Sequence, residues 1–177
     1  MKLNQVFQVG IAFSGLAVSF ARLLTIPTTP FSQSSGEYSL NQVKRIIVDS
    51  RFANAVDNDG HTLIPPTLTQ FAETFQADLK SSIGLDISLS QAKQPTPDSI
   101  FITIQQSPDF KDVARRLTPE GYMLDISSQG VVISGASPLG AWWGTRSLIQ
   151  TAVVGGLKLP QGSGVDAPGW GSRGAFV

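Results

Sequence analysis

The sequence predicts an α+β domain, in which a small, mainly antiparallel sheet carries two helices packed on one face. Three observations lead to this prediction. Short runs of β-branched residues indicate strands, two longer segments repeat apolar residues at the helical period, and the predicted order is strand, helix, strands, hairpin, helix. Segregation of a hairpin and separate helices in this way favours α+β over a regular alternation of strands and helices.

Composition restricts the class of protein. The chain has 177 residues, 41% of them apolar, with 13 basic and 13 acidic side chains, so it has room for one core and a formal net charge of zero. A neutral chain has no electrostatic footprint for nucleic acid or an anionic membrane, and neither is expected as a partner. Because cysteine is absent, stability must come from packing against a core or a partner.

The N-terminus is typical of a secretory signal peptide over residues 1–21. Lys2 precedes an apolar run, and Ser19-Phe20-Ala21 offers a small-residue cleavage site. A membrane anchor is disfavoured, because the run is shorter than the ~20 apolar residues a span needs and Gln8 interrupts it. We therefore expect a secreted, extracellular protein. Residues 22–43, rich in Ser, Thr and Pro, are predicted to be an exposed, disordered leader.

Folding is expected to begin with a strand over residues 45–49. After Pro65-Pro66-Thr67, a helix is predicted to run to Ile83, with Thr67 and Gln70 forming a capping box and Gly84 taking a left-handed conformation at the end. Its predicted core face consists of Leu68, Phe71, Ala72, Phe75, Leu79 and Ile83.

The remaining elements follow from alternation and turn signals. Residues 85–89 are a candidate strand, and residues 90–99 have the composition of a linker or hinge. A strand is predicted over 100–105, with one face better buried than the other. Strands at 121–127 and 130–135 flank Ser128-Gln129, which predicts a hairpin with Gly130 at positive φ.

The second helix, from about Pro138 to Val153, has an unusual composition. A stripe of small residues, Gly140, Gly144, Ser147 and Thr151, runs beside the predicted core face, although each interior glycine costs about 1 kcal/mol relative to alanine. Two interpretations stay open: the stripe packs on the domain's own sheet, or it docks a second domain. Arg146 is placed to stack on an indole. The predicted core face is Ala141, Trp142, Thr145, Leu148, Ile149, Ala152 and Val153.

Candidate chemistry is sparse. His61 is the single histidine and lies in a turn-rich loop without a nucleophile motif, and Asp57-x-Asp59-Gly60 lacks the closing glutamate of a calcium loop. No zinc-ligand spacing or phosphate loop occurs, so no metal or cofactor is expected. The glutamates are isolated in the sequence, which favours solvated surface positions over a catalytic pair. They are Glu37, Glu73 and Glu120.

Two stretches carry a family resemblance: EGYMLDISSQGVVISGASPLGAWWGTRSLIQT at 120–151, and LPQGSGVDAPGWGSRG at 159–174. They resemble the non-catalytic N-terminal domain of β-N-acetylhexosaminidases, the family-20 glycoside hydrolases, of the secreted fungal type; residues 46–68 support the match. The resemblance implies a zincin-like fold without zinc. It also implies the domain boundaries: residues 44–160 for this domain, and residues 161–177 for a linker and the truncated start of a catalytic (β/α)₈ barrel.

The family's reaction is retaining hydrolysis of terminal β-linked N-acetylhexosamine, in which the substrate's acetamido oxygen attacks the anomeric carbon. The catalytic Asp-Glu pair of that family belongs to the barrel, so this chain is expected to lack catalytic and substrate-binding residues. Its expected partners are the barrel, in the same chain, and a glycan; a homodimer is also open. The alternative is a self-standing secreted binding or chaperone-like module. The predicted barrel-facing residues are Gly140, Trp142, Trp143, Gly144 and Arg173.

Overall fold

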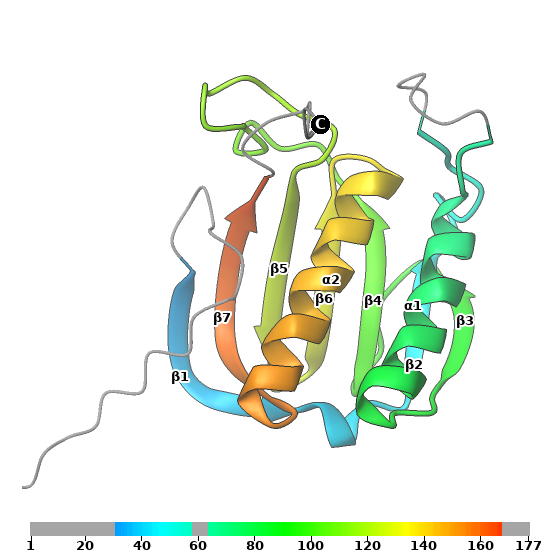
Figure 1. Ribbon diagram of the computed structural model, residues 1–177, viewed down its shortest axis with the longest axis vertical. Helices are drawn as coiled ribbons and strands as arrows, with labels where there is room; N and C mark the ends of the chain where they lie inside the picture. The colour runs from blue at the N-terminus through cyan, green and yellow to red at the C-terminus, as the bar shows by residue number, and fades with distance from the viewer. Residues whose placement is uncertain (1–30, 58–63, 168–177) are drawn as a thin grey trace, which may run out of the picture.

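The structure is a computed structural model, and it describes residues 31–57 and 64–167 (Figure 1). The strands are β1 (Ser32–Ser39), β2 (Arg45–Asp49), β3 (Ser88–Ala92), β4 (Ser99–Ile104), β5 (Tyr122–Ser127), β6 (Gly130–Gly135) and β7 (Lys158–Asp166). The helices are α1 (Leu68–Ile83) and α2 (Pro138–Gly155), and a short 3₁₀ turn covers Leu40–Gln42.

The strands form one mixed sheet in the order β1-β7-β5-β6-β4-β2-β3. The pairs β1·β7, β7·β5 and β5·β6 are antiparallel, whereas β6·β4, β4·β2 and β2·β3 are parallel. The prediction of a mainly antiparallel sheet is therefore wrong. Parallel pairing arises because α1 carries the chain from the end of β2 back to the start of β3, a crossover whose direction is invisible in the strand sequences themselves.

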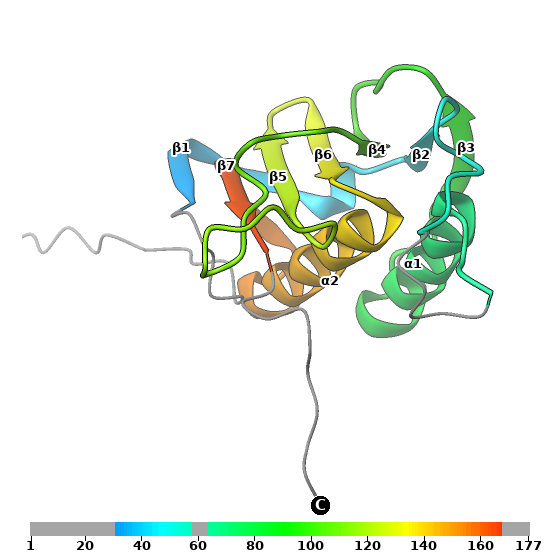
Figure 2. The same ribbon diagram turned by 90° about the horizontal axis from the view of Figure 1, so that it is seen from above.

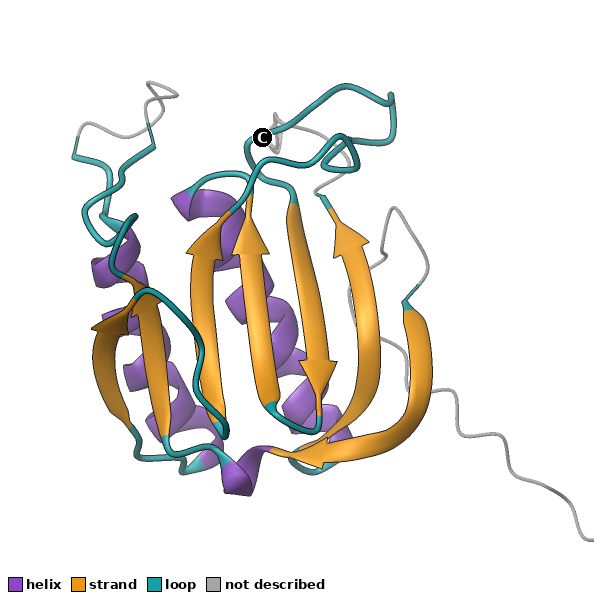
Figure 3. Cartoon of the chain, turned by 180° about the vertical axis from the view of Figure 1, so that it is seen from behind, coloured by secondary structure: helices purple, strands orange, loops and turns teal. Residues whose placement is uncertain are grey.

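Both helices cover one face of the sheet, as the sequence predicts (Figures 1 and 3). Apolar side chains from the strands and helices fill the layer between them. The contributors include Ile46, Val48, Ile100, Ile102, Leu124, Ile126, Val131 and Ile133 from the sheet, and Phe75, Leu79, Leu148 and Ala152 from the helices. Burial of this core is the main favourable term in folding.

The first helix confirms its sequence signals at both ends. The Gln70 amide donates to Thr67 Oγ1 at 3.1 Å, and the Thr67 amide donates to Gln70 Oε1 at 2.8 Å, which completes the capping box. Gly84 ends the helix with φ 72°. Leu68, Ala72, Phe75 and Leu79 are buried, while Phe71 and Ile83 at the edges of the predicted face are half-buried.

The β5–β6 hairpin also matches its prediction. Ser127 pairs with Gly130, whose φ is 136°, and a Cβ on Gly130 would lie 2.4 Å from the Ser99 carbonyl oxygen. Glycine is therefore required for the turn and for the close approach of β4. On β4 the face of Ile100 and Ile102 is the more fully buried one, as predicted, but the opposite face is buried as well, with Phe101 only 4% exposed. A strand central in a parallel stretch is covered on both sides.

Two edge regions differ from the predictions. Ser32–Ser39 is strand β1, and Tyr38, Leu40 and Val43 are buried, so the expected disordered leader is wrong for this part of residues 22–43. Likewise Lys158–Asp166 is strand β7, so residues 161–166 are not a linker. Both strands pair through their backbones and carry few apolar residues, which leaves little alternation to detect.

Residues 90–99, predicted to be a linker or hinge, include the end of β3 and its connection to β4. Residues 90–92 belong to β3, which starts three residues later than the predicted strand at 85–89, and Ser99 begins β4. The chain between them crosses the face of the sheet away from the helices (Figure 3). Its end is held because the Asp98 amide donates to the Gln129 carbonyl at 2.8 Å and Lys44 Nζ donates to Asp98 Oδ2 at 2.7 Å.

Candidate functional site: the outward surface of the two helices

The two helices are joined by an aromatic and cationic contact. The rings of Phe71 on α1 and Trp142 on α2 are stacked, with centroids 5.2 Å apart and an interplanar angle of 28°. The Arg146 guanidinium lies 3.7 Å from the Trp142 ring centroid and 5.9 Å from that of Phe75. This confirms the predicted stacking of Arg146 on an indole. Stacking of this kind contributes about 0.5–2 kcal/mol, depending on how far the cation is desolvated.

Arg146 also bridges the helices through polar contacts. Its Nη1 donates to Asp78 Oδ2 on α1, and its Nε donates to Thr145 Oγ1 at 3.2 Å. The side chain is 23% exposed and that of Asp78 is 35% exposed, so the pair lies at the outer margin of the helix layer. Arg146 therefore fixes the spacing of the two helices on the surface that they turn away from the sheet.

The glycine stripe lies on the inner side of α2. A Cβ on Gly140 would lie 2.3 Å from the Gly121 carbonyl oxygen and 2.8 Å from that of Pro119, and one on Gly144 would lie 2.5 Å from Ile133 Cγ2. The prediction that Gly140 and Gly144 face a second domain is wrong. The helix keeps them because their absence of a side chain lets α2 approach its own sheet.

The buried face of α2 is consequently centred on the small residues. Together with Ala141, Thr145, Leu148 and Ala152, the stripe is buried, whereas Trp142, Trp143 and Ile149 are half-buried and Val153, predicted to be core, is 56% exposed. Val154 is exposed as well. A helix that is apolar both toward and away from its sheet is typical of an element covered on both sides. We define the helix surface as Trp142, Trp143, Arg146, Val153 and Val154.

A buried polar trio links three elements behind this surface. Tyr122 on β5 donates its hydroxyl hydrogen to Asp166 Oδ2 at 2.9 Å and is hydrogen-bonded to Ser147 on α2. Asp166 Oδ1 accepts the Ala167 amide at 2.8 Å, where β7 ends. Tyr122, Ser147 and Asp166 are all buried, and their hydrogen bonds join β5, β7 and α2.

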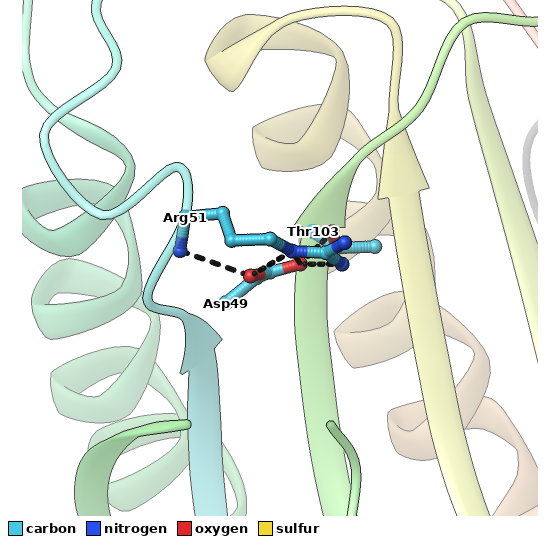
Figure 4. Close-up of polar contacts among 3 residues, drawn as sticks. All are labelled: Asp49, Arg51 and Thr103. Atoms are coloured by element: carbon cyan, nitrogen blue, oxygen red, sulfur yellow. Dashed lines mark hydrogen bonds and ion pairs between the residues drawn. The ribbon is translucent and has the colours of Figure 1, made fainter. Parts of the chain in front are cut away.

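A second polar cluster closes the carboxyl ends of the parallel strands (Figure 4). The carboxylate of Asp49 is fully buried and accepts from Arg51 Nε at 3.0 Å, Arg51 Nη2 at 2.7 Å and Thr103 Oγ1 at 2.7 Å. Burial by itself raises the pKa of Asp49, but these hydrogen bonds outweigh it and hold the pKa below its ordinary value. Because the Arg51 guanidinium and the Thr103 hydroxyl occupy its oxygens, the Asp49 carboxylate has a structural role: it anchors the turn that follows β2.

The three glutamates lie on separate elements, in agreement with the prediction of isolated positions. Glu37 lies on the edge strand β1 and Glu73 lies on the exposed side of α1, while Glu120 precedes β5. Within residues 31–57 and 64–167, no group of three or more His, Cys, Asp or Glu side chains could hold a metal ion. His61 and Arg173 fall outside the described residues, as does most of the Asp57–Gly60 turn. Neither described helix has the length and apolarity needed to cross a bilayer.

Sequence reasoning missed both polar clusters. Asp49 and Thr103 are 54 positions apart, as the parallel pairing of β2 and β4 allows, and Tyr122 and Asp166 are 44 apart. The one available signal was Asp49 itself, an acidic residue directly after a β-branched run, since polar side chains gather where parallel strands end.

These features together define an α+β domain, whose described part has closed polar clusters and an apolar outer helix surface. A comparison with known families agrees: the profile described as glycosyl hydrolase family 20, domain 2, matches residues 29–167. The chain belongs to this family. The matched range begins before β1 and ends just after β7, so it contains the whole described sheet.

Two curated relatives are similar in sequence. The lacto-N-biosidase of Bifidobacterium bifidum is 26% identical over 161 residues, which cover 90% of this chain and 12% of that protein. The β-hexosaminidase of Porphyromonas gingivalis is 28% identical over 119 residues, which cover 62% of this chain and 14% of that protein. The chain thus spans a small part of the length of these relatives.

Solved structures share the fold. The N-acetyl-β-hexosaminidase of Streptomyces plicatus superposes with a TM-score of 0.54 at 17% identity, covering 82% of this chain and 26% of that one. The family-20 β-N-acetylhexosaminidase of Streptomyces coelicolor gives a TM-score of 0.52 at 17% identity, with the same coverage. In homologues, the domain is normally joined to a catalytic barrel.

Proposed function

We propose that this chain is the N-terminal accessory domain of a secreted β-N-acetylhexosaminidase and that its helix surface packs against the catalytic barrel of the same polypeptide. The observation that carries the proposal is the match to domain 2 of family 20 over residues 29–167, with the fold of β-hexosaminidase accessory domains over the same elements. The apolar signal-like N-terminus supports export.

The complete enzyme removes terminal β-linked N-acetylhexosamine from glycans or chito-oligosaccharides. Its reaction is a substrate-assisted, retaining hydrolysis, with the orienting Asp and the acid–base Glu supplied by the barrel. This chain contributes no catalytic residue. Its role is to support the barrel, and by itself it is inactive.

The composition of the helix surface indicates that a partner covers it and that it is not left exposed to solvent. Val153 and Val154 are exposed side by side, and the half-buried Trp142 and Trp143 precede them on the same helix. Aromatic residues and arginine are enriched at the centres of protein interfaces, and Arg146 is already held in one orientation by Trp142 and Asp78. A preorganised side chain loses less entropy when a partner covers it.

The direct test is to express the reading frame with its downstream sequence and assay a chromogenic N-acetylglucosaminide. We expect hydrolysis by the extended protein and none by the 177-residue chain. A downstream sequence without activity would count against the enzyme assignment. Turnover by the 177-residue chain alone would refute the accessory role.

Export has a separate test. Expression with the native N-terminus should deliver the protein to the medium with residues 1–21 removed, as N-terminal sequencing would reveal. Retention of Met1 in a cell-associated product would contradict the secreted assignment.

A further inference from the structure

The connection between β4 and β5 contains a small, tightly folded hairpin that we call the loop hairpin, residues 110–118. Lys111 and Leu117 form an antiparallel bridge. The Asp112 amide donates to the Arg116 carbonyl at 2.9 Å, and the Thr118 amide donates to the Phe110 carbonyl at 3.0 Å. The Phe110 side chain is buried against Gly121, so the base of the hairpin is anchored in the domain.

Side-chain contacts also hold the tip of the loop hairpin. The nearly buried carboxylate of Asp112 accepts from the Arg116 amide at 2.9 Å and from Arg116 Nε at 2.8 Å. Arg115 has φ 62°, a left-handed conformation that a residue with a side chain adopts only when its surroundings enforce it. The hairpin is therefore a preformed element.

This preformed element presents apolar side chains to solvent. Val113 is 59% exposed and Leu117 is 69% exposed. The hairpin is also basic, because residues 111–117 contain three basic side chains and one acidic side chain, a net charge of +2. Within the described residues, Arg116 pairs with Asp112, while Lys111 and Arg115 form no ion pair. A rigid loop with exposed apolar groups and two unpaired cations has the features of a recognition surface.

The position of the loop hairpin connects it to the helix surface. Ser137, the N-cap of α2, donates its hydroxyl to the Pro119 carbonyl at 2.9 Å, so the base of the hairpin lies beside the first turn of α2. Figure 2 shows the β4–β5 connection passing over this end of the sheet. Strand β7 also ends at this edge, because its last residue, Asp166, pairs with Tyr122 at the start of β5. A domain that follows β7 is tethered next to the hairpin.

We propose that the loop hairpin is a second docking element for the catalytic barrel, with Val113 and Leu117 contacting an apolar patch and Arg115 pairing with a carboxylate on the barrel. This inference rests on the proposed function, because it takes the same barrel as the occupant. It adds the partner's chemistry: an apolar surface bordered by acidic side chains, next to the first turn of α2. The end of β7 at this edge favours this occupant over a separate protein, and the net positive charge of the hairpin sets the sign of the surface expected on the barrel.

The test compares the full-length protein with the 177-residue chain. Three variants are made in both: Val113→Ser/Leu117→Ser, Arg115→Glu, and Lys93→Glu as a matched charge reversal on the crossover of the opposite face. Thermal and urea unfolding then give the unfolding equilibrium constant of this domain in each background. We expect the double variant and Arg115→Glu each to raise that constant about tenfold in the full-length protein. Lys93→Glu should leave it unchanged in both backgrounds.

Trp143→Ser separates this inference from the proposed function. Suppose that Trp143→Ser raises the unfolding equilibrium constant more in the full-length protein than in the 177-residue chain, and that the hairpin variants do not. The docking role of the hairpin is then overturned, while the helix surface keeps its role. If neither change has an effect specific to the full-length protein, both proposals fail. Equal destabilisation of the 177-residue chain by the hairpin variants would make the hairpin purely structural. Loss of a dimer on mutating the hairpin would identify a second copy as the occupant and overturn the inference.

Discussion

Replacing Gly140 with alanine tests the placement of the glycine stripe, because the two interpretations predict opposite signs. If Gly140 lay on an open surface, alanine would stabilise α2 by about 1 kcal/mol through helix propensity. In the structure, the new Cβ lies 2.3 Å from the Gly121 carbonyl oxygen, more than 1 Å inside an ordinary contact of about 3.5 Å. Both opposing oxygens, those of Gly121 and Pro119, belong to the backbone, so neither can rotate away.

The magnitude follows from these two terms. Overpacking costs about 1–3 kcal/mol, and a clash with backbone oxygens that cannot rotate away belongs in the upper part of that range, at about 2–3 kcal/mol. The propensity gain of about 1 kcal/mol offsets part of this cost. We expect Gly140→Ala to lower the stability of the chain by about 1–2 kcal/mol. For a domain of this size the melting temperature should then fall by roughly 3–8 °C.

Gly155→Ala is the matched control. Gly155 ends the same helix, its φ is not positive, and a Cβ there meets nothing within 4 Å. We expect this variant to be neutral or to raise the melting temperature by a few degrees. Circular dichroism melts of the three proteins decide the question. An increase for Gly140→Ala comparable to that for Gly155→Ala would refute the packing of α2 against Gly121.

Three further predictions follow from the side-chain contacts. Arg146→Lys keeps the charge beside Asp78 but loses the planar stacking on Trp142, and should reduce the unfolding free energy by about 0.5–2 kcal/mol in urea titrations; a wild-type midpoint would show that the stacking contributes nothing. Tyr122→Phe removes a hydrogen bond to the Asp166 carboxylate and should cost about 1.5–3 kcal/mol in the same titration, whereas a neutral result would argue against the trio. Because the pKa of Asp49 is held below the ordinary value of 3.8, Asp49 contributes stability above that pH and loses it as the pH falls through the lowered pKa. Asp49→Asn should therefore be less stable at pH 7, and its stability should decline less steeply as the pH falls below 3.8; parallel pH profiles would contradict this.

Local signals predicted the regular elements well. The capping box of Thr67 and Gln70, the left-handed Gly84 and the hairpin turn at Gly130 all rest on interactions within a few residues of each other. The same is true of the stacking of Arg146 on Trp142, four positions apart on one helix. These features appear in the structure because their stabilising contacts are local and do not depend on which distant segments pack together.

Other features depended on partners far away in the chain. Strand β1 is almost wholly exposed and polar, and it is a strand only because β7 offers a backbone to pair with. The composition of Ser32–Ser39 predicted a leader rather than a strand. In the same way, the glycines of β7 predicted a linker. A polar edge strand carries no side-chain pattern that distinguishes it from a loop.

The amino-acid sequence by itself determined the family, the two helices with their ends and the central hairpin, since periodicity, caps and turns are encoded within short segments. Only the tertiary structure decided that half of the strand pairs are parallel, that Gly140 and Gly144 face inward, and that Asp49 meets Thr103. The physical reason is that strand direction and close approach are properties of pairs of segments. The sequence around a glycine is the same whether that glycine packs against the sheet of its own domain or against a neighbouring domain.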